Sequence, residues 1–332
     1  TWTSLGLDGV IVYTVIADPD HPERLYAAGY SEEGQWPTVR HTTFFWSPDA
    51  GQTWHRSLVG TFLQSLFSLA FTPGPAPRTL YASGSVGMLR STDGGASWTP
   101  LGGNAAYQMV IDPRDPTVLY SVAGVEAAFK SSDGAQTWQA MPVTHRRCYF
   151  SAVNLVATTP ETLYTGGCGV FRSQDGGATW HEIPGAPDGV TSIAVDPRAP
   201  ERLYVGTLAA SDEGVGGLYR SIDGGATWQR LDGAGSRVDH VLLDPADPKT
   251  VIVSGYKEPT VRWSRDEGAT WSALGGQAPT YDFKSLTLIG GTLLAGGQGG
   301  LWKVTLPPHT LGTPGMPATG GGGGASLRSL AT

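Results

Sequence analysis

The eight residues SIDGGATW, from Ser221 to Trp228, decide the fold of this 332-residue chain. They follow the pattern S-x-D-x-G-x-[TS]-W, here called the box. It occurs five more times, as SPDAGQTW from Ser47, STDGGASW from Ser91, SSDGAQTW from Ser131, SQDGGATW from Ser173 and SRDEGATW from Ser264. The copy from Ser131 is slightly degenerate, because Ala135 stands at the glycine place of the pattern. The boxes begin 44, 40, 42, 48 and 43 residues apart (91 − 47, 131 − 91, 173 − 131, 221 − 173 and 264 − 221). A repeat of this length is typical of propeller blades and solenoid units.

The residues between boxes also repeat in a fixed order: an apolar stretch, a Pro-rich turn, a Leu-Tyr strand, a Gly-rich loop and a short strand. The segments MVIDPRDPTVLYSVAG and IAVDPRAPERLYVGT show the first part of this order. Alternating apolar and polar residues indicate strands, and the Asp-Pro pairs between them indicate hairpin turns. Each repeat therefore predicts four short antiparallel strands, A to D from the inside outward, with the box as the C–D turn.

Within the box, the aspartate can accept hydrogen bonds from turn N–H groups, and the glycines allow a positive φ. The tryptophan is expected to pack between neighbouring sheets. The six box aspartates are Asp49, Asp93, Asp133, Asp175, Asp223 and Asp266. A ring of metal-binding or catalytic carboxylates is the alternative, but sixfold repetition favours a folding device. A cation precedes four boxes, at Arg90, Lys130, Arg172 and Arg220, and is expected to point outward from its blade.

Six boxes predict seven blades when the chain ends are included. The stretch 285–304, SLTLIGGTLLAGGQGGLWKV, supplies strands A to C without a box. The first residues, TWTSLG, match the segments that follow two boxes, SWTPLG from Ser97 and TWSALG from Thr270. We therefore predict an all-β, seven-bladed β-propeller over residues 1–305, closed by an N-terminal D strand in the last blade. Residues 306–332 are expected to form a flexible Gly/Pro-rich tail.

Composition excludes several classes of protein. With 47 glycines, 24 prolines and 15% charged residues, the chain is unsuited to an all-helical fold. Its net charge of −7 is the wrong sign for binding nucleic-acid phosphates or anionic lipid. Since no apolar run approaches the ~20 residues of a membrane helix, no membrane span is expected. The seven histidines form no metal-binding motif, two cysteines are too few for a typical zinc site, and no cofactor is expected. We expect a monomer.

The repeated boxes resemble the Asp-box, or BNR, repeats of β-propeller proteins. That superfamily includes sialidases, xyloglucanases, sortilin-type receptors and a photosystem assembly factor of similar size. The resemblance implies the propeller fold and leaves the function open, because enzymes, receptors and scaffolds share it. Xyloglucanases are similar in the DP-x-x-P-x-x-LY and box pattern, and they place catalytic aspartates between two propellers, whereas this chain predicts one.

Loops D–A and B–C of a propeller gather at the face where ligands generally bind. Four aspartates fall in these loops close to the inner strands: Asp8, Asp188, Asp239 and Asp282. Two of them could serve as the acid and base of a glycoside hydrolase, provided that their carboxyls lie ~5–9 Å apart. Solvated turn carboxylates are the alternative for each residue taken singly.

The same loops carry candidate ligand-binding residues. The cations could bind a carboxylate or an acidic partner loop, and the aromatic residues could stack on a sugar or peptide. The candidates are Trp36, His145, Arg146, Arg147, Arg237, His240 and Tyr281. The alternatives are neutralisation of the cations by nearby acids such as Asp239, and packing of the aromatic residues on adjacent loops.

Two further features bear on location. Cys148 begins an A strand and Cys168 ends the next B strand, so a disulfide is plausible, with two separate thiols as the alternative. A disulfide favours an oxidising, extracytoplasmic compartment. In the tail, MPATG from Met316 resembles the LPxTG-type signal of sortase substrates, and it is either a truncated surface anchor or a linker.

The sequence thus predicts a non-enzymatic binding or scaffold propeller, secreted or cell-surface, that recognises a protein or glycan through its loop face. The alternative is a glycoside hydrolase of xyloglucanase-like type that uses the loop aspartates.

Overall fold

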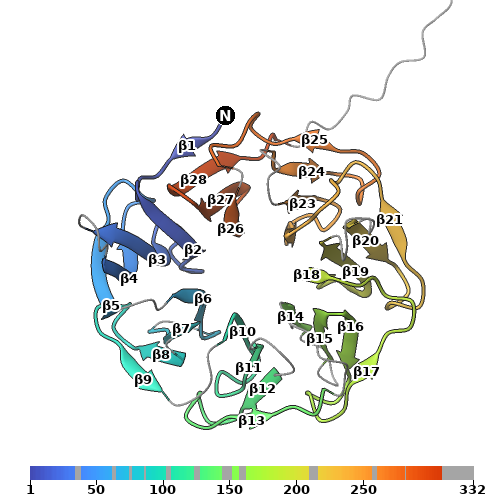
Figure 1. The fold of residues 1–332 in the computed structure, drawn as a ribbon, viewed down its shortest axis with the longest axis horizontal. Helices are drawn as coiled ribbons and strands as arrows, with labels where there is room; N and C mark the ends of the chain where they lie inside the picture. Colours follow the sequence, from blue (N-terminus) through green and yellow to red (C-terminus); the bar gives the residue numbers. More distant parts are fainter. Residues whose placement is uncertain are drawn as a thin grey trace, which may run out of the picture.

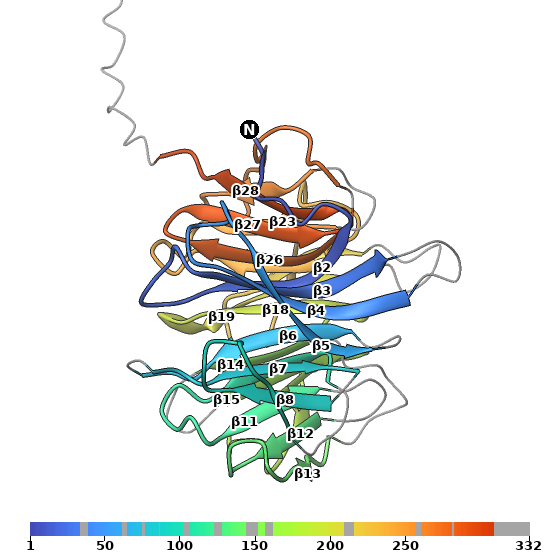
Figure 2. The ribbon, with the colours of Figure 1, turned by 90° about the vertical axis from the view of Figure 1, so that its left-hand side faces the viewer.

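A computed structural model of the chain describes residues 1–33, 39–61, 65–74, 77–85, 87–101, 106–122, 128–143, 152–156, 162–208, 216–255, 260–280 and 282–308. Seven four-stranded antiparallel sheets are arranged as blades around a central axis (Figure 1). Seen from the edge, the ring is a disc whose blades stack around its circumference (Figure 2). The predicted seven-bladed propeller is confirmed, and the described residues contain no helix.

Each blade runs from the channel outward through strands A, B, C and D. The A strands are β2 (Val10–Ala17), β6 (Leu66–Phe71), β10 (Gln108–Ile111), β14 (Ala152–Val156), β18 (Val190–Asp196), β22 (His240–Leu243) and β26 (Phe283–Ile289). The B strands are β3 (Leu25–Glu33), β7 (Leu80–Gly84), β11 (Leu119–Val122), β15 (Thr162–Gly167), β19 (Ala199–Thr207), β23 (Val251–Ser254) and β27 (Thr292–Gly297).

The C strands are β4 (Val39–Ser47), β8 (Gly87–Ser91), β12 (Ala128–Ser131), β16 (Gly169–Ser173), β20 (Gly217–Ser221), β24 (Arg262–Ser264) and β28 (Gly300–Thr305). The D strands are β5 (His55–Thr61), β9 (Thr99–Leu101), β13 (Gln139–Ala140), β17 (His181–Glu182), β21 (Gln229–Leu231), β25 (Ser272–Ala273) and β1 (Thr3–Ser4). The B strands are the most buried, since all residues of β7, β11 and β23 are buried.

The N-terminus closes the ring, as predicted. Strand β1 pairs with β28 of the last blade, with Thr3 opposite Lys303. Leu5 is buried against the first blade, and its carbonyl accepts a hydrogen bond of 2.7 Å from the indole Nε1 of Trp54. The two ends of the described chain therefore share one sheet, and the pairing of β1 with β28 closes the ring.

All six boxes have the same hydrogen bonds. In the box of the fifth blade, the Oγ of Ser221 donates to Asp223 (2.8 Å) and accepts from the backbone N–H of Gly225 (2.8 Å). Asp223 also accepts from the backbone N–H and the hydroxyl of Thr227, at 2.9 and 2.6 Å. Equivalent bonds occur in the other five boxes. The hydroxyl and N–H four residues downstream therefore hold the box aspartate in place.

These hydrogen bonds lower the pKa of the box aspartates. The hydroxyl bond from Thr227 is the largest cause at Asp223, whose pKa is about 2 against an ordinary value of 3.8. Four more boxes have the same value from the equivalent bonds, at Asp49, Asp93, Asp133 and Asp175. At Asp266 burial acts in the opposite direction, yet bonds from Thr270 and Ser264 still hold its pKa below the ordinary value.

The cations that precede the boxes do more than point outward. Lys130 donates to the carbonyl of Gly176 (3.0 Å), and Arg172 donates to the carbonyl of Gly224 (3.2 Å). Each acceptor belongs to the box of the next blade. The expectation of simple outward blade residues missed this contact, because it depends on how neighbouring blades pack rather than on the strand itself.

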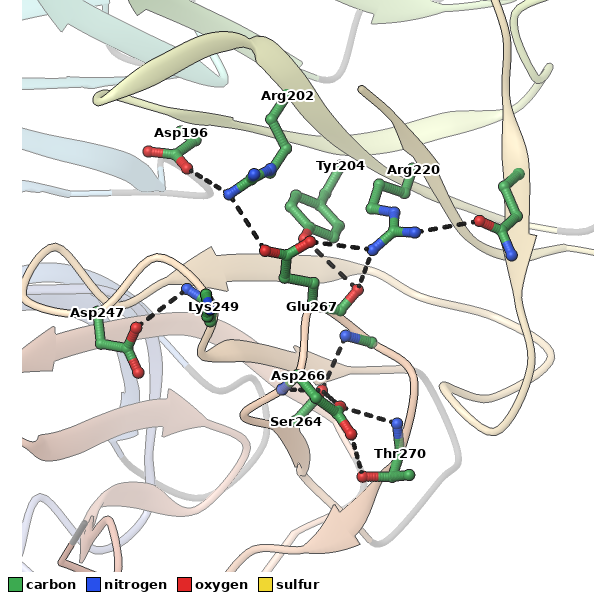
Figure 3. Close-up of polar contacts among 12 residues, drawn as sticks. Asp196, Arg202, Tyr204, Arg220, Asp247, Lys249, Ser264, Asp266, Glu267 and Thr270 are labelled. Carbon is green, nitrogen blue, oxygen red and sulfur yellow. Dashed lines mark hydrogen bonds and ion pairs between the residues drawn. The ribbon is translucent and has the colours of Figure 1, made fainter. Parts of the chain in front are cut away.

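The contact between the fifth and sixth blades adds an ion-pair network (Figure 3). Glu267 lies between Arg202 and Arg220, with N–O distances of 3.4 Å to each. Arg202 also pairs with the buried Asp196 at 3.1 Å, and Arg220 donates to the backbone carbonyl of Glu267 at 3.0 Å. Glu267 has a φ of +60° at a box position where four other copies have glycine. The positive φ of Glu267 strains its backbone, and it occurs at the place where its carboxylate joins two blades.

Candidate functional site

Hydrogen bonds between loops show which loops lie together on each face of the disc. The box and the A–B turn of one blade lie together, since the N–H of Gly224 donates to the carbonyl of Glu201 (2.8 Å). The D–A and B–C loops also lie together, since the N–H of Leu208 donates to the carbonyl of Gly189 (2.9 Å). We call these the box face and the loop face.

The inner strands are irregular where they enter the channel from the loop face. Pairing with the B strand shifts by one residue between Val12 and Thr14, and the extra residue is Tyr13. The same shift leaves Phe67, Thr191 and Lys284 as extra residues in three other blades. A bulge of this kind changes the direction of one side chain, and such bulges are common beside functional sites.

The residue after the bulge links neighbouring inner strands and defines equivalent positions around the ring. Ser285, directly after Lys284, accepts a hydrogen bond from the N–H of Val15, two residues after Tyr13. Bonds from Met109 to Ser68 and from Val241 to Ser192 repeat this spacing. This repeated spacing defines one equivalent position in each blade, which we call the ring position. It is occupied by Tyr13, Phe67, Tyr107, Thr191, Asp239 and Lys284. The equivalent residue of the fourth blade is not described.

All six of these side chains line one cavity of about 650 Å³, which is the central channel. A cavity of this size is typical of sites for small or extended ligands. The ring positions of the first three blades carry aromatic residues, and those of the fifth to seventh carry polar or charged residues. The channel therefore has two chemically different sides.

The charged side is built from two ion pairs on neighbouring blades. Arg237 pairs with Asp239 through its Nε at 2.9 and 3.1 Å, and Lys284 pairs with Asp282 at 2.8 Å. We call these four residues and His240 the ionic cluster. All five line a second cavity of about 480 Å³ at the mouth of the channel.

In both ion pairs the cation is the more exposed partner. The side chains of Arg237 and Lys284 are 41% and 34% exposed, whereas Asp239 and Asp282 are each 18% exposed. The ionic cluster thus presents positive charge to solvent, although the whole chain is net acidic.

His240 lies between these pairs and is held by the backbone of the last blade. Its Nε2 lies 3.2 Å from the carbonyl oxygen of Phe283. Because a carbonyl only accepts, the ring proton is on Nε2. Burial lowers the pKa of His240, while the bond to Phe283 and the charge of Asp239 act in the opposite direction. A neutral imidazole at neutral pH follows.

The structure brings together four of the residues selected from the sequence: Arg237, Asp239, His240 and Asp282. Asp8 and Asp188 are exposed and line neither of these two cavities. The remaining candidates lie outside the described residues: Trp36, His145, Arg146, Arg147 and Tyr281.

Sequence reasoning missed Lys284 and the three aromatic ring positions. In the sequence, Lys284 is indistinguishable from an ordinary strand residue. Tyr13, Phe67 and Tyr107 fit the apolar alternation of the inner strands. An alignment of the inner strands places these residues in register only once the bulges are known from the strand pairing of the structure.

Cys168 is disulfide-bonded. Cys148, the other cysteine of the sequence, lies outside the described residues, so their pairing stays a prediction. Among the described residues, no group of three or more His, Cys, Asp or Glu side chains is arranged to hold a metal ion. The described part of the chain also has no helix that is long and apolar enough to cross a membrane.

The fold and the channel place this chain in the class of seven-bladed propellers, with a central channel that opens at the loop face. No family model matches the sequence. A probable oligoxyloglucan-reducing end-specific xyloglucanase of Neosartorya fischeri is 26% identical over 181 residues, 52% of this chain and 18% of that protein. A Paenibacillus xyloglucanase is 29% identical over 139 residues, 31% of this chain and 14% of that protein. The chain thus spans less than a fifth of the length of the curated relatives it matches.

Solved structures are similar in fold. YCF48 from Cyanidioschyzon merolae has a TM-score of 0.66 at 14% identity, over 92% of this chain and 98% of that one. YCF48 bound to D1 peptide has a TM-score of 0.65 at 15% identity, over 93% and 96%. The GH74 enzyme of Niastella koreensis has a TM-score of 0.55 at 17% identity, over 89% of this chain and 66% of that one. At these identities the likeness shows the fold alone.

Proposed function

We propose that this propeller is a non-enzymatic binding module that recognises an acidic segment of a partner protein at the ionic cluster. The observation that carries the proposal is the order of exposure within the two ion pairs. Arg237 and Lys284 are outermost, and their carboxylates lie deeper. A ligand that approaches the mouth meets the cations first, and guanidinium and ammonium groups bind carboxylates through charge-assisted hydrogen bonds.

The same order argues against catalysis by these aspartates. A glycoside hydrolase needs one carboxyl that carries a proton and a second that reaches the sugar or its attacking water. Asp239 and Asp282 each contact a cation, at 2.9 and 2.8 Å, that is more exposed than the carboxylate itself. Both carboxylates are therefore engaged in positioning the cations.

The comparisons support a binding role at the level of fold. The solved structure of YCF48 bound to D1 peptide shows that a propeller similar over 93% of this chain can hold a peptide. The disulfide at Cys168 supports an oxidising compartment, and we place the protein outside the cytoplasm on that ground.

The test uses poly-L-glutamate as a simple acidic probe. The purified chain should bind it despite the net charge of −7, and binding should weaken as salt screens the cations. We expect the double change Arg237→Gln and Lys284→Gln to weaken binding by about tenfold or more. Arg230→Gln is the matched control, because Arg230 forms an ion pair of 2.9 Å with Asp232 in the same i, i+2 geometry on an outer strand. Equal loss in the control would contradict a specific site.

A glycoside hydrolase of xyloglucanase-like type is the second candidate. Asp239 and Asp282 favour it because they line one cavity, and two curated relatives are xyloglucanases. Release of reducing ends from xyloglucan that disappears in both Asp239→Asn and Asp282→Asn would establish this function and displace the binding proposal.

A further inference from the structure

The aromatic side of the channel has no role in the binding site proposed above. Tyr13, Phe67 and Tyr107 occupy ring positions of three consecutive blades and form a continuous row of contacts. The ring centroids of Tyr13 and Phe67 lie 5.4 Å apart, and those of Phe67 and Tyr107 lie 5.2 Å apart. We call these three residues the aromatic arc.

The aromatic arc is open to solvent rather than sealed in the core. Tyr107 is 50% exposed, whereas the tyrosines of the B strands, such as Tyr120 and Tyr204, are fully buried. Tyr13 and Phe67 are half-buried and line the same cavity of about 650 Å³ as the ionic cluster residues Asp239 and Lys284. A ligand in the channel can therefore contact both sides.

The geometry of the arc indicates what it binds. The planes of Tyr13 and Phe67 are at 84°, so these two rings form a corner, whereas the planes of Phe67 and Tyr107 are at 34°. A flat ring face suits a sugar, whereas a corner suits a third aromatic ring in edge-to-face contact. The bulges at Tyr13 and Phe67 place these two side chains there, although each costs a regular strand pairing.

We infer that the aromatic arc binds an aromatic side chain of the same partner segment whose carboxylate binds the ionic cluster. The ligand class is an extended protein segment that carries an aromatic residue close to an acidic one. This inference rests on the proposed function for its acidic half, and the aromatic half rests on the arc alone.

The test is a peptide array probed with the full chain. Acidic peptides are printed in matched pairs, with phenylalanine or tryptophan in one member and alanine at that place in the other. The wild-type chain should be retained about fivefold more strongly by the aromatic member. Tyr107→Ala and Phe67→Leu should each lower this preference and leave the preference for acidic over neutral peptides. Tyr107 is half-exposed, so its variant keeps the test valid if Phe67→Leu is poorly folded.

The outcomes separate the two proposals. The double change Arg237→Gln and Lys284→Gln should remove the acidic preference and keep the aromatic one, with Arg230→Gln unchanged in both. Equal retention of both members of each pair would overturn the inference and leave the proposed function standing. Loss of all acidic preference in the wild type would overturn the proposed function and with it the composite ligand. A glycan array on which Tyr107→Ala loses a neutral oligosaccharide bound by the wild type would make the arc a sugar site and overturn the inference.

Discussion

The two faces of the ring differ in how uniform their equivalent positions are. On the box face, six boxes have the same serine, aspartate and threonine or serine hydrogen bonds. On the loop face, the ring position of the six blades in which it is described carries tyrosine, phenylalanine, threonine, aspartate or lysine. Sameness around a ring indicates a folding device, because each blade needs the same turn. Variation at one structural position indicates recognition, because it gives the channel two chemically different sides.

The largest effect is expected where the ring closes. Deletion of residues 1–6 removes strand β1, the buried Leu5 and Trp2, whose ring stacks on Phe283 at 5.6 Å. Loss of these side chains should lower the free energy of unfolding by more than about 5 kcal/mol. Urea unfolding of the truncated chain measures it, with the exposed Thr3→Ala as control. An unchanged midpoint would show that the first blade stays fixed without closure.

Acid should unfold the protein through the box face. Hydrogen bonds lower the pKa of five box aspartates to about 2 from an ordinary value of 3.8. Because the pKa is lower in the folded state, the stabilisation is complete above pH 3.8 and is lost as pH falls toward 2. The melting temperature should therefore decrease steeply between about pH 4 and pH 2. A melting temperature that stays constant down to pH 2 would contradict the role of these carboxylates.

A single box hydroxyl should matter more than a mouth cation. Ser221 is buried, and its Oγ accepts from the N–H of Gly225. Ser221→Ala leaves that donor unpaired and should cost about 2 kcal/mol. Lys284→Gln breaks a partly exposed ion pair and should cost less than about 1 kcal/mol. Equal changes in the urea midpoint would erase the distinction between the folding face and the recognition face.

The same distinction explains what the sequence could predict. The box is local, since eight residues contain both donors and acceptors of the turn, so its repetition predicts blade number and closure. The loop aspartates Asp239 and Asp282 were also predictable from their place before inner strands. Lys284 and the aromatic arc were not, because a bulge decides which face a strand residue occupies, and a one-residue shift has no signature in the apolar alternation.

Glu267 is the one charged residue among the box positions with a positive φ, and it tests how uniform the box face is. Glu267→Gln keeps the left-handed backbone and removes the charge between Arg202 and Arg220, so it should destabilise by about 1 kcal/mol. Glu267→Gly loses the same ion pairs but relieves about 1 kcal/mol of backbone strain, so it should be close to the wild type. Thermal unfolding of both variants distinguishes these effects. If the glycine variant were more stable by the full strain energy, the ion-pair network would contribute nothing.

The smallest effect concerns His240, and it separates the faces by pH. Burial lowers the pKa of His240 in the folded protein, whereas the unfolded chain takes up its proton near pH 6.5. Between these two values the unfolded state binds more protons, so stability should rise with pH up to about 6.5. His240→Gln should remove this rise, measured as the urea midpoint from pH 5 to pH 7.

The acid limb of the same profile is the internal control. His240→Gln leaves the box aspartates untouched, so its melting temperature should still decrease between about pH 4 and pH 2. A loss of slope in both ranges would mean that the substitution has disturbed the whole ring. A loss only near neutral pH would assign that range to the loop-face mouth, where Asp239, Asp282 and Lys284 surround the imidazole. The two faces would then be distinguished by one titration, the box face in acid and the recognition face close to neutrality.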